Sequence, residues 1–178
     1  ADRLVSSSDA SVTSPVYDAH GNTTQIGTTP VTQFAYDSSD RNSSITVGSK
    51  SATYTRDVQG RTIQRVLVNG STTTNKYGFT GAGDSPDLLL DASNAIVEKY
   101  EQLPGGVLLT VRPNQTAPAN RVFSLVNVHG DTMATTDANG TQTGTFMYDP
   151  FGNPVASSPN NTATGSTYGW VGQHEKDT

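Results

Sequence analysis

The residues that could perform acid–base or nucleophilic chemistry are scattered along the chain. A glycosidase needs two carboxyl groups at a defined separation, and one stretch contains four candidates: Asp87, Asp91, Glu98 and Glu101. We interpret them instead as solvated carboxylates of strands and turns. Ser85 stands in Gly-Asp-Ser-Pro, which lacks the Gly-x-Ser-x-Gly pattern of a nucleophilic serine. A hydrolase that uses acidic side chains is therefore only our second alternative.

Metal and ligand chemistry has equally little support. The histidines His20, His129 and His174 have no second ligand at i, i+4 spacing, so we predict packing in turns and no metal site. The chain has no Cys, which excludes disulfides and thiolate ligands, and we expect no cofactor. Trp170, the only Trp, is a possible binding residue because its ring can stack on a sugar. Packing at a sheet edge is the other interpretation of Trp170.

The composition favours short strands joined by turns. Of the 178 residues 33% are hydrophobic, and Ser, Thr, Asn and Gly are abundant. Ser, Asn and Gly disfavour helices, Thr, Val, Ile and Tyr fit strands, and Asn, Asp, Gly and Pro fit turns. A disordered chain is the alternative for such a composition, but the apolar residues occur in ordered clusters.

The distribution of charge and of apolar residues argues against two classes of partner. The 11 basic and 16 acidic residues give a net charge of −5, with no basic stripe that could neutralise phosphates. We therefore expect no nucleic-acid binding. No apolar run approaches the ~18 residues of a membrane-spanning helix, so we expect no membrane span.

A short motif recurs along the chain: an aromatic residue, Asp, two variable residues, Gly and a polar residue. The first three Asp residues of this series are 19 and then 20 residues apart, and the third copy has Arg56 in place of the aromatic residue. We predict that the motif forms repeat turns, and its residues are Tyr17, Asp18, Gly21, Tyr36, Asp37, Asp57, Gly60, Tyr148, Asp149 and Gly152.

The motif has a physical basis in turn chemistry. The Asp side chain can accept hydrogen bonds from backbone amides two or three residues further on. Gly, three positions after Asp, can adopt a positive φ and reverse the chain as a bulged hairpin. In the second copy Asp40 replaces this Gly, and Asp tolerates the left-handed region better than most residues do.

Strand-like segments lie between these turns. Thr32, Phe34 and Tyr36 share one face of segment 31–36, since side chains alternate along a strand. Segment 61–68 has apolar residues on both sides, which predicts either burial of both faces or an ambiguous register. Each period of about 20 residues then holds two strands and two turns, which is an antiparallel meander with mostly neighbouring contacts.

The second half of the chain is less regular. Residues 92–101 are the best candidate for a helix, but their two β-branched residues and the flanking turns argue against it. Segment 157–165 is a low-complexity loop. The other elements that we expect are a loop at 81–86, strands at 87–90, 95–102 and 122–128, a turn at 91–94 and a polar connection at 112–120.

The motif copies resemble the YD repeats of the rearrangement-hotspot (Rhs) and teneurin proteins. Gly-Asp-Ser-Pro at 83–86, Leu-Pro-Gly-Gly-Val-Leu-Leu at 103–109 and Asn-Val-His-Gly-Asp at 127–131 are similar to the last repeats of long bacterial Rhs proteins. Segment 168–174, Tyr-Gly-Trp-Val-Gly-Gln-His, resembles the entry to the associated core of that family. The resemblance covers nearly the whole chain.

The resemblance implies an all-β fold, in which an antiparallel meander of hairpins forms a curved or spiralling sheet that is part of a β-shell. In this family the shell encloses a C-terminal toxin or signalling domain, and a core domain cuts the chain with paired aspartates. Their motif does not occur in these 178 residues. We therefore expect a structural scaffold that is not an enzyme, with regular repeats at 1–80, divergent repeats at 81–156 and a loop and core entry at 157–178.

The resemblance also implies partners and a location. The expected partners are neighbouring repeats and the enclosed domain of a longer parent protein, which is secreted or lies at the bacterial cell surface. Open sheet edges invite pairing with another copy, so we also expect homo-oligomers. The first alternative is an extracellular adhesion module that binds a carbohydrate or a cell-surface protein through Tyr-, Trp- and Asn-rich loops.

Overall fold

The computed structural model describes residues 3–4, 7–9, 12–155 and 169. This part of the chain is all β, as the sequence predicts, apart from a 3-10 turn, η1, at Pro104–Gly106. The strands are β1 (Val16–Tyr17), β2 (Thr23–Ile26), β3 (Thr32–Tyr36), β4 (Asn42–Val47), β5 (Lys50–Arg56), β6 (Thr62–Asn69), β7 (Ser71–Gly78), β8 (Leu88–Leu90), β9 (Ile96–Gln102), β10 (Leu108–Val111), β11 (Arg121–Val126), β12 (Thr132–Thr136) and β13 (Gln142–Thr145).

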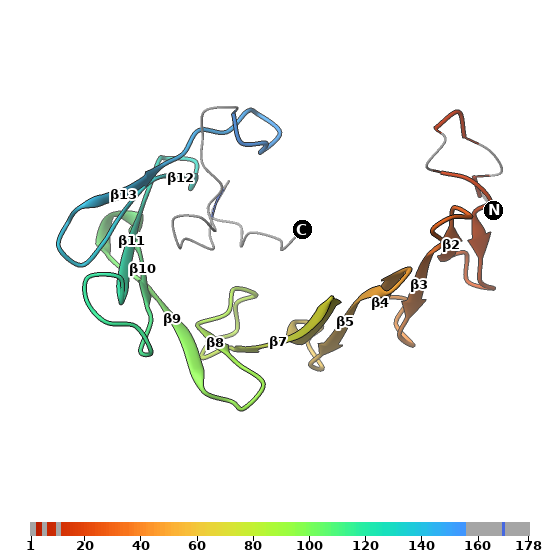
Figure 1. The fold of residues 1–178 in the computed structure, drawn as a ribbon, viewed down its shortest axis with the longest axis horizontal. Coiled ribbons are helices and arrows are strands. Elements are labelled where there is room, and N and C mark those ends of the chain that lie inside the picture. Colours follow the sequence, from red (N-terminus) through yellow and green to blue (C-terminus); the bar gives the residue numbers. More distant parts are fainter. Residues whose placement is uncertain (1–2, 5–6, 10–11, 156–168, 170–178) are drawn as a thin grey trace. The chain divides into compact units, whose positions relative to one another are not determined.

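The strands follow one another in the sheet in chain order and pair antiparallel, which confirms the predicted meander (Figure 1). Residues 92–101, the rejected helix candidate, contain most of β9. No described residue belongs to a helix long and apolar enough to cross a membrane.

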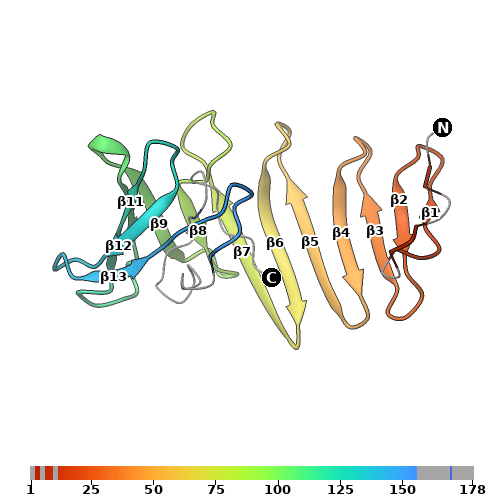
Figure 2. The ribbon, with the colours of Figure 1, turned by 90° about the horizontal axis from the view of Figure 1, so that it is seen from above.

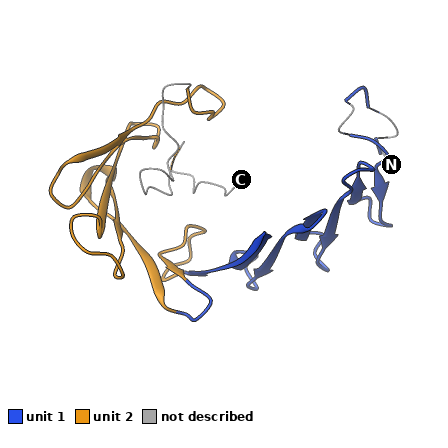
Figure 3. Cartoon of the chain, in the orientation of Figure 1, with its two compact units in different colours: residues 1–78, 91–94 blue, residues 79–90, 95–178 orange. Residues whose placement is uncertain are grey.

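Two compact units make up the chain (Figure 3). Unit 1 comprises residues 1–78 and 91–94, and unit 2 comprises residues 79–90 and 95–178. The strands of unit 1 lie side by side in a single layer (Figure 2). Every described residue that is buried belongs to unit 2.

Alternation along the strands of unit 1 follows the sequence pattern. Thr32, Phe34 and Tyr36 of β3 are half-buried, and the residues between them are exposed. Phe34 pairs directly with Ile45 of β4, so two apolar side chains meet on the same face. The apolar face of each strand is thus aligned with that of its neighbour.

Strand β6 resolves the ambiguity of segment 61–68. Its residues from Thr62 to Val68 are all half-buried, so apolar side chains on both faces are partly covered and neither face is fully buried. A single register holds the strand, with Leu67 opposite Ala52 of β5 and opposite Thr73 of β7.

The predicted strand at 122–128 is too long at its C-terminal end. β11 ends at Val126 because Asn127 begins a turn. Val128, which the strand prediction included, is fully exposed at the tip of that turn. A turn-forming Asn therefore overrides the apolar character of Val128.

Candidate functional site: the repeat turns

The turn at Asp57 shows how one repeat reverses the chain. The Asp57 N–H donates to the Arg61 carbonyl, and the Gly60 N–H donates to the Asp57 carbonyl, each at 3.0 Å. The Asp57 carboxylate closes the loop, because its Oδ1 accepts the N–H groups of Gln59 and Arg61, each at 2.9 Å. Two backbone amides that would otherwise face water are thereby satisfied by one side chain.

This set of bonds recurs at six places in the described chain. At each place the N–H of the first residue donates to the carbonyl four residues on, and the N–H three residues on donates back. The side-chain Oδ1 of the first residue accepts the amides two and four residues on. The first residues of the six turns are Asp18, Asp37, Asp57, Asn127, Asp137 and Asp149.

The observed bonds differ in one respect from those that the sequence predicts. The amide two residues after Asp is bound, but the second bound amide is four residues on instead of three. The amide three residues on, from Gly60 in the third copy, donates to the backbone carbonyl of Asp57 instead. The side chain therefore accepts two of the three amides, and the backbone carbonyl of the same residue accepts the third.

Two of these turns, at Asn127 and Asp137, were not assigned as motif copies from the sequence. Neither residue follows an aromatic residue, and Asn127 has an amide where the other turns have a carboxylate. Gly130 and Gly140, three positions on, have φ of 88° and 79°. A search for Asp or Asn followed three residues later by Gly would have found both turns.

The fourth position of the turn needs a positive φ. Gly21, Gly60 and Gly152 have φ of 97°, 88° and 87°, a region that side chains with a Cβ rarely enter. Asp40 adopts φ of 57° at the same position. The second turn therefore keeps its geometry although it lacks Gly.

The fifth position of the turn supplies a second bond to the carboxylate. Oδ2 of the first Asp accepts a side-chain N–H from the residue four positions on: Asn22 at 3.0 Å, Arg41 at 3.1 Å, Arg61 at 2.8 Å and Asn153 at 2.8 Å. In the turn at Asn127 the roles are reversed, and the Asn127 amide donates to Asp131 at 2.7 Å. The motif therefore extends one residue beyond its Gly.

These bonds favour the ionised form of the turn carboxylates. Hydrogen bonding by the Asn22 side chain lowers the pKa of Asp18, and hydrogen bonding by the Asn153 side chain lowers that of Asp149. The Arg41 amide is the largest cause that lowers the pKa of Asp37. A carboxylate that accepts several N–H groups loses its proton more easily, so these turns keep their acceptors in weak acid.

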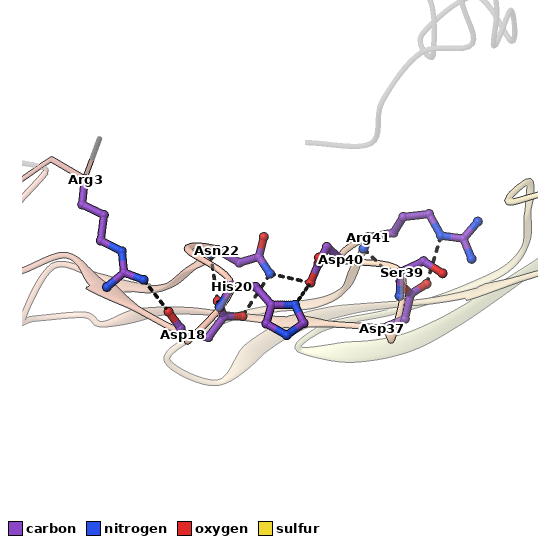
Figure 4. Close-up of polar contacts among 8 residues, drawn as sticks. All are labelled: Arg3, Asp18, His20, Asn22, Asp37, Ser39, Asp40 and Arg41. Atoms are coloured by element: carbon purple, nitrogen blue, oxygen red, sulfur yellow. Dashed lines mark hydrogen bonds and ion pairs between the residues drawn. The ribbon is translucent and has the colours of Figure 1, made fainter. Parts of the chain in front are cut away.

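Neighbouring turns of unit 1 also contact each other (Figure 4). Asp40 Oδ1 lies 2.8 Å from His20 Nδ1 and accepts the Asn22 side-chain amide at 2.9 Å, which links the second turn to the first. The Arg41 guanidinium lies so close to Gly60 that a Cβ there would collide with it, which places the second turn against the third. The three turns form a continuous row, which we call the turn ladder.

The aromatic residues of the motif make contacts beyond their own turns or across them. The Tyr36 hydroxyl donates to the Thr23 carbonyl at 2.8 Å, and the Tyr17 hydroxyl donates to the Leu4 carbonyl at 3.1 Å. Tyr148 forms an isolated bridge with Pro154 across the turn at Asp149. The structure thus places all ten predicted motif residues in or beside turns.

The acidic residues considered for hydrolysis each have a separate partner. Asp87 accepts the Thr80 N–H and hydroxyl, Asp91 accepts the Ser93 N–H, Glu98 binds Arg112 and Tyr100, and Glu101 binds Lys99. Ser85 is exposed in the loop after β7. His20 and His129 lie in turns, and no cluster of three or more potential metal ligands occurs among the described residues. Trp170 and His174 lie outside the described residues.

No protein-family model matches the chain. Individual proteins with a similar sequence do match it. A tRNA3(Ser)-specific nuclease WapA from Bacillus spizizenii is 31% identical over 170 residues. A tRNA nuclease WapA from Bacillus subtilis (strain 168) is 29% identical over 170 residues. Each alignment covers 91% of this chain but only 7% of the relative. The chain therefore matches a small part of each named nuclease.

Solved structures with a similar fold belong to a toxin complex. A crystal structure of TcdB2-TccC3-TEV has a TM-score of 0.60 and 15% identity, and it covers 90% of this chain and 8% of that chain. A structure of the Photorhabdus luminescens Tc holotoxin pore has a TM-score of 0.60 at 16% identity with the same coverage. At this level of identity the likeness shows a shared fold.

Proposed function

This chain belongs to the YD-repeat (Rhs) family, and we propose that it forms a wall segment of a YD-repeat shell in a longer parent protein. In this role it encloses a C-terminal toxin or effector domain and performs no catalysis itself. The observation that carries the proposal is the recurrence of one turn at six places in a sheet whose strands follow chain order. Such a sheet extends by adding repeats, because each strand pairs only with its chain neighbours.

The sequence relatives support a role for the chain as part of a larger protein. Nearly all of this chain aligns with about a fourteenth of the length of the named WapA nucleases, since it covers 7% of each. We propose that nuclease activity in such proteins resides outside the aligned repeats. The turn carboxylates support this view because each one already accepts backbone amides, which leaves it poorly suited to acid–base chemistry.

The proposal extends to location and domain organisation. We propose that the parent protein is secreted or displayed at the bacterial cell surface, as the family resemblance implies. Within the chain, the division into regular repeats at 1–80, divergent repeats at 81–156 and a core entry at 157–178 stays a prediction. The enclosed domain and the neighbouring repeats are the proposed partners.

Protection from protease tests enclosure. In the parent protein we expect the C-terminal domain to resist limited proteolysis while the repeats are intact. Combining Asp37→Ala with Asp57→Ala should open two turns of the ladder and make that domain cleavable. The matched control is Asp84→Ala, in an exposed loop. A C-terminal domain that is cleaved equally fast with intact and with opened turns would exclude enclosure by these repeats.

A nuclease assay tests the absence of catalysis. The isolated chain should leave tRNA intact under conditions in which a WapA nuclease cleaves it. Cleavage that co-purifies with the isolated chain and disappears in a single-residue variant of it would make the chain an enzyme.

A further inference from the structure

The dipeptide Asn-Gly occurs twice in the chain, as Asn69-Gly70 and as Asn139-Gly140. In this dipeptide the Asn side-chain amide is open to attack by the backbone nitrogen of the next residue, because Gly has no side chain to shield that nitrogen. The first pair lies at the tip of the hairpin that joins β6 to β7, where residues 69–73 are all exposed (Figure 2). The second pair occupies the third and fourth positions of the turn at Asp137.

The two pairs match each other in backbone shape and in crowding. Gly70 has φ of 78° and Gly140 has φ of 79°. Asn69, Asn139 and both Gly residues are exposed. At either Gly, no described atom lies within 4 Å of the position that a Cβ would take. Access of water and steric hindrance therefore do not distinguish the two pairs.

Hydrogen bonds do distinguish the two pairs. The Gly140 N–H donates to the Asp137 carbonyl at 3.1 Å. The amides on either side of it, from Asn139 and Thr141, donate to Asp137 Oδ1 at 2.8 and 2.9 Å. The Gly70 N–H, in contrast, makes no hydrogen bond among the described residues. The attacking nitrogen is thus held in place in the turn at Asp137 and is free at the hairpin tip.

We propose that Asn69 is a site of spontaneous deamidation, and that the turn bonds at Asp137 protect Asn139 from the same reaction. The Gly70 nitrogen gives its proton to a base and bonds to Asn69 Cγ. The Cγ–Nδ2 bond breaks, and Nδ2 takes up a proton and leaves as ammonia. Water then opens the resulting cyclic imide at one of its two carbonyl carbons. One opening gives aspartate, and the other gives isoaspartate, in which the main chain runs through Cγ.

The product changes both the charge and the geometry of the β6–β7 hairpin. Each event adds one negative charge, so the net charge of the chain goes from −5 to −6. Isoaspartate also adds one carbon to the main chain at the position where Asn69 pairs with Ser71. The added carbon disrupts this last pair, because antiparallel pairing requires equal backbone lengths on the two strands.

Peptide mapping by mass spectrometry, during incubation of the whole chain in mildly alkaline buffer, compares the two sites within one molecule. Reaction at Asn139 first requires the bonds of the Asn139 and Gly140 amides to open, so we expect Asn69 to react faster by about tenfold or more. In denaturant the two rates should become similar, because both sites are then unfolded Asn-Gly. Equal rates in the folded chain would overturn the proposal. So would a difference that persists in denaturant, because flanking sequence would then be its cause.

Two variants test the chemistry and the protection separately. Asn69→Gln keeps an amide but lengthens the side chain, so the same imide cannot form and modification at this position should disappear. Asp137→Ala removes the side-chain acceptor of the turn and should speed the reaction at Asn139 severalfold while leaving Asn69 unchanged. The matched control Asp84→Ala, in an exposed loop, should change neither rate. An Asp137→Ala chain in which Asn139 reacts as slowly as in the wild type would contradict protection by the turn. The comparison in denaturant uses the wild-type chain and decides the proposal even where a variant is unstable.

Discussion

At each repeat turn a single side chain replaces water as the partner of two backbone amides. All six described turns use Asp or Asn, whose short side chain places an oxygen within reach of the amides two and four residues on. The next requirement is a positive φ three residues on, which Gly or Asp40 meets. The residue directly after the turn Asp takes no part in these bonds, and in the third turn it is Val58, which is fully exposed.

Asp57→Ala tests the contribution of the turn carboxylate. The substitution leaves the amides of Gln59 and Arg61 and the Arg61 guanidinium without their acceptor. We expect the free energy of unfolding of unit 1 to fall by about 1–2 kcal/mol, as for the loss of a capping side chain. Chemical denaturation measures the change.

One further substitution separates charge from hydrogen bonding at this turn, and another serves as a control elsewhere in the chain. Asp57→Asn keeps an oxygen for the two amides and should cost less than Asp57→Ala. Asp84→Ala, in an exposed loop, should change stability by no more than about 0.5 kcal/mol. An Asp57→Ala chain as stable as the wild type would show that the turn does not depend on its carboxylate.

His20 makes the contact between the first two turns dependent on pH. The hydrogen bond with Asp40 is the largest cause that raises the pKa of His20 above 6.5, and the charges of Asp40 and Asp18 add to it. A raised pKa in the folded state means that this stabilisation is complete below pH 6.5 and is lost as pH rises through the raised value. Hydrogen bonds from Asn22 and His20 lower the pKa of Asp40 below 3.8, so the pair persists down to that lowered value.

NMR titration of His20 checks this behaviour. In the wild type we expect a pKa above 6.5, and in Asp40→Asn a lower pKa, since the partner charge is removed. The Asp40→Asn chain should also lose less stability than the wild type between roughly pH 5 and 8, the range in which His titrates. Equal His20 titration curves in the two chains would show that the contact does not form in solution.

Among the elements, β9 and the residue that follows β10 form a buried polar cluster. Glu98 Oε1 accepts Arg112 Nε at 2.8 Å, and Glu98 Oε2 accepts the Tyr100 hydroxyl at 2.7 Å. The side chains of the ion pair are 8% and 10% exposed. The register of β9 and β10 places both side chains on the same face of the sheet, where both are buried, so the two charges must compensate each other with little access to water.

Arg112→Met tests this pairing. It leaves the Glu98 charge buried without its cation, and we expect unit 2 to lose about 3–5 kcal/mol of stability. Combining Arg112→Met with Glu98→Gln removes both charges and keeps an acceptor for Tyr100, so the double variant should lose less than Arg112→Met alone. Denaturation of the three chains gives the comparison. A double variant as unstable as the single one would mean that packing of Arg112, not its charge, holds the pair.

At the scale of the whole molecule, the two end strands of the sheet have no second neighbour among the strands that the structure describes. Strands β1 and β13 occupy the two ends of the strand order. An unpaired edge exposes backbone N–H and C=O groups that can pair with another chain. In the proposed parent protein, further repeats would fill these positions.

The isolated chain should therefore associate through its edges. Static light scattering over a concentration series should give a mass that rises above 18.7 kDa, the mass of one chain. Thr145→Lys, at an exposed position of β13, should reduce association because Lys on an edge strand opposes pairing. A mass that stays at that of one chain at all concentrations would contradict the prediction.

Much of the architecture could be predicted from local sequence. The alternation of Thr32, Phe34 and Tyr36 predicted the face of β3. For segment 61–68 the apolar residues on both sides left burial of both faces and an ambiguous register as alternatives, and the structure has one register with both faces half-buried. The turn at Asn127 was harder to predict, because an amide replaces the carboxylate and no aromatic residue precedes it. Local sequence patterns predicted a strand or a turn correctly where the contacts that form it lie within a few residues of each other.

The sequence by itself determined where the chain turns and reverses its direction. Asp accepts amides two and four residues on, and Gly adopts positive φ, so both effects act within five residues. Only the tertiary structure decided that Asp40 bonds to His20, 20 residues away, and that Glu98 pairs with Arg112, 14 residues away. It also decided which face of unit 2 is covered. The physical reason is that a strand alternates the same way in a covered sheet and in an open one, so only spatial neighbours distinguish the two.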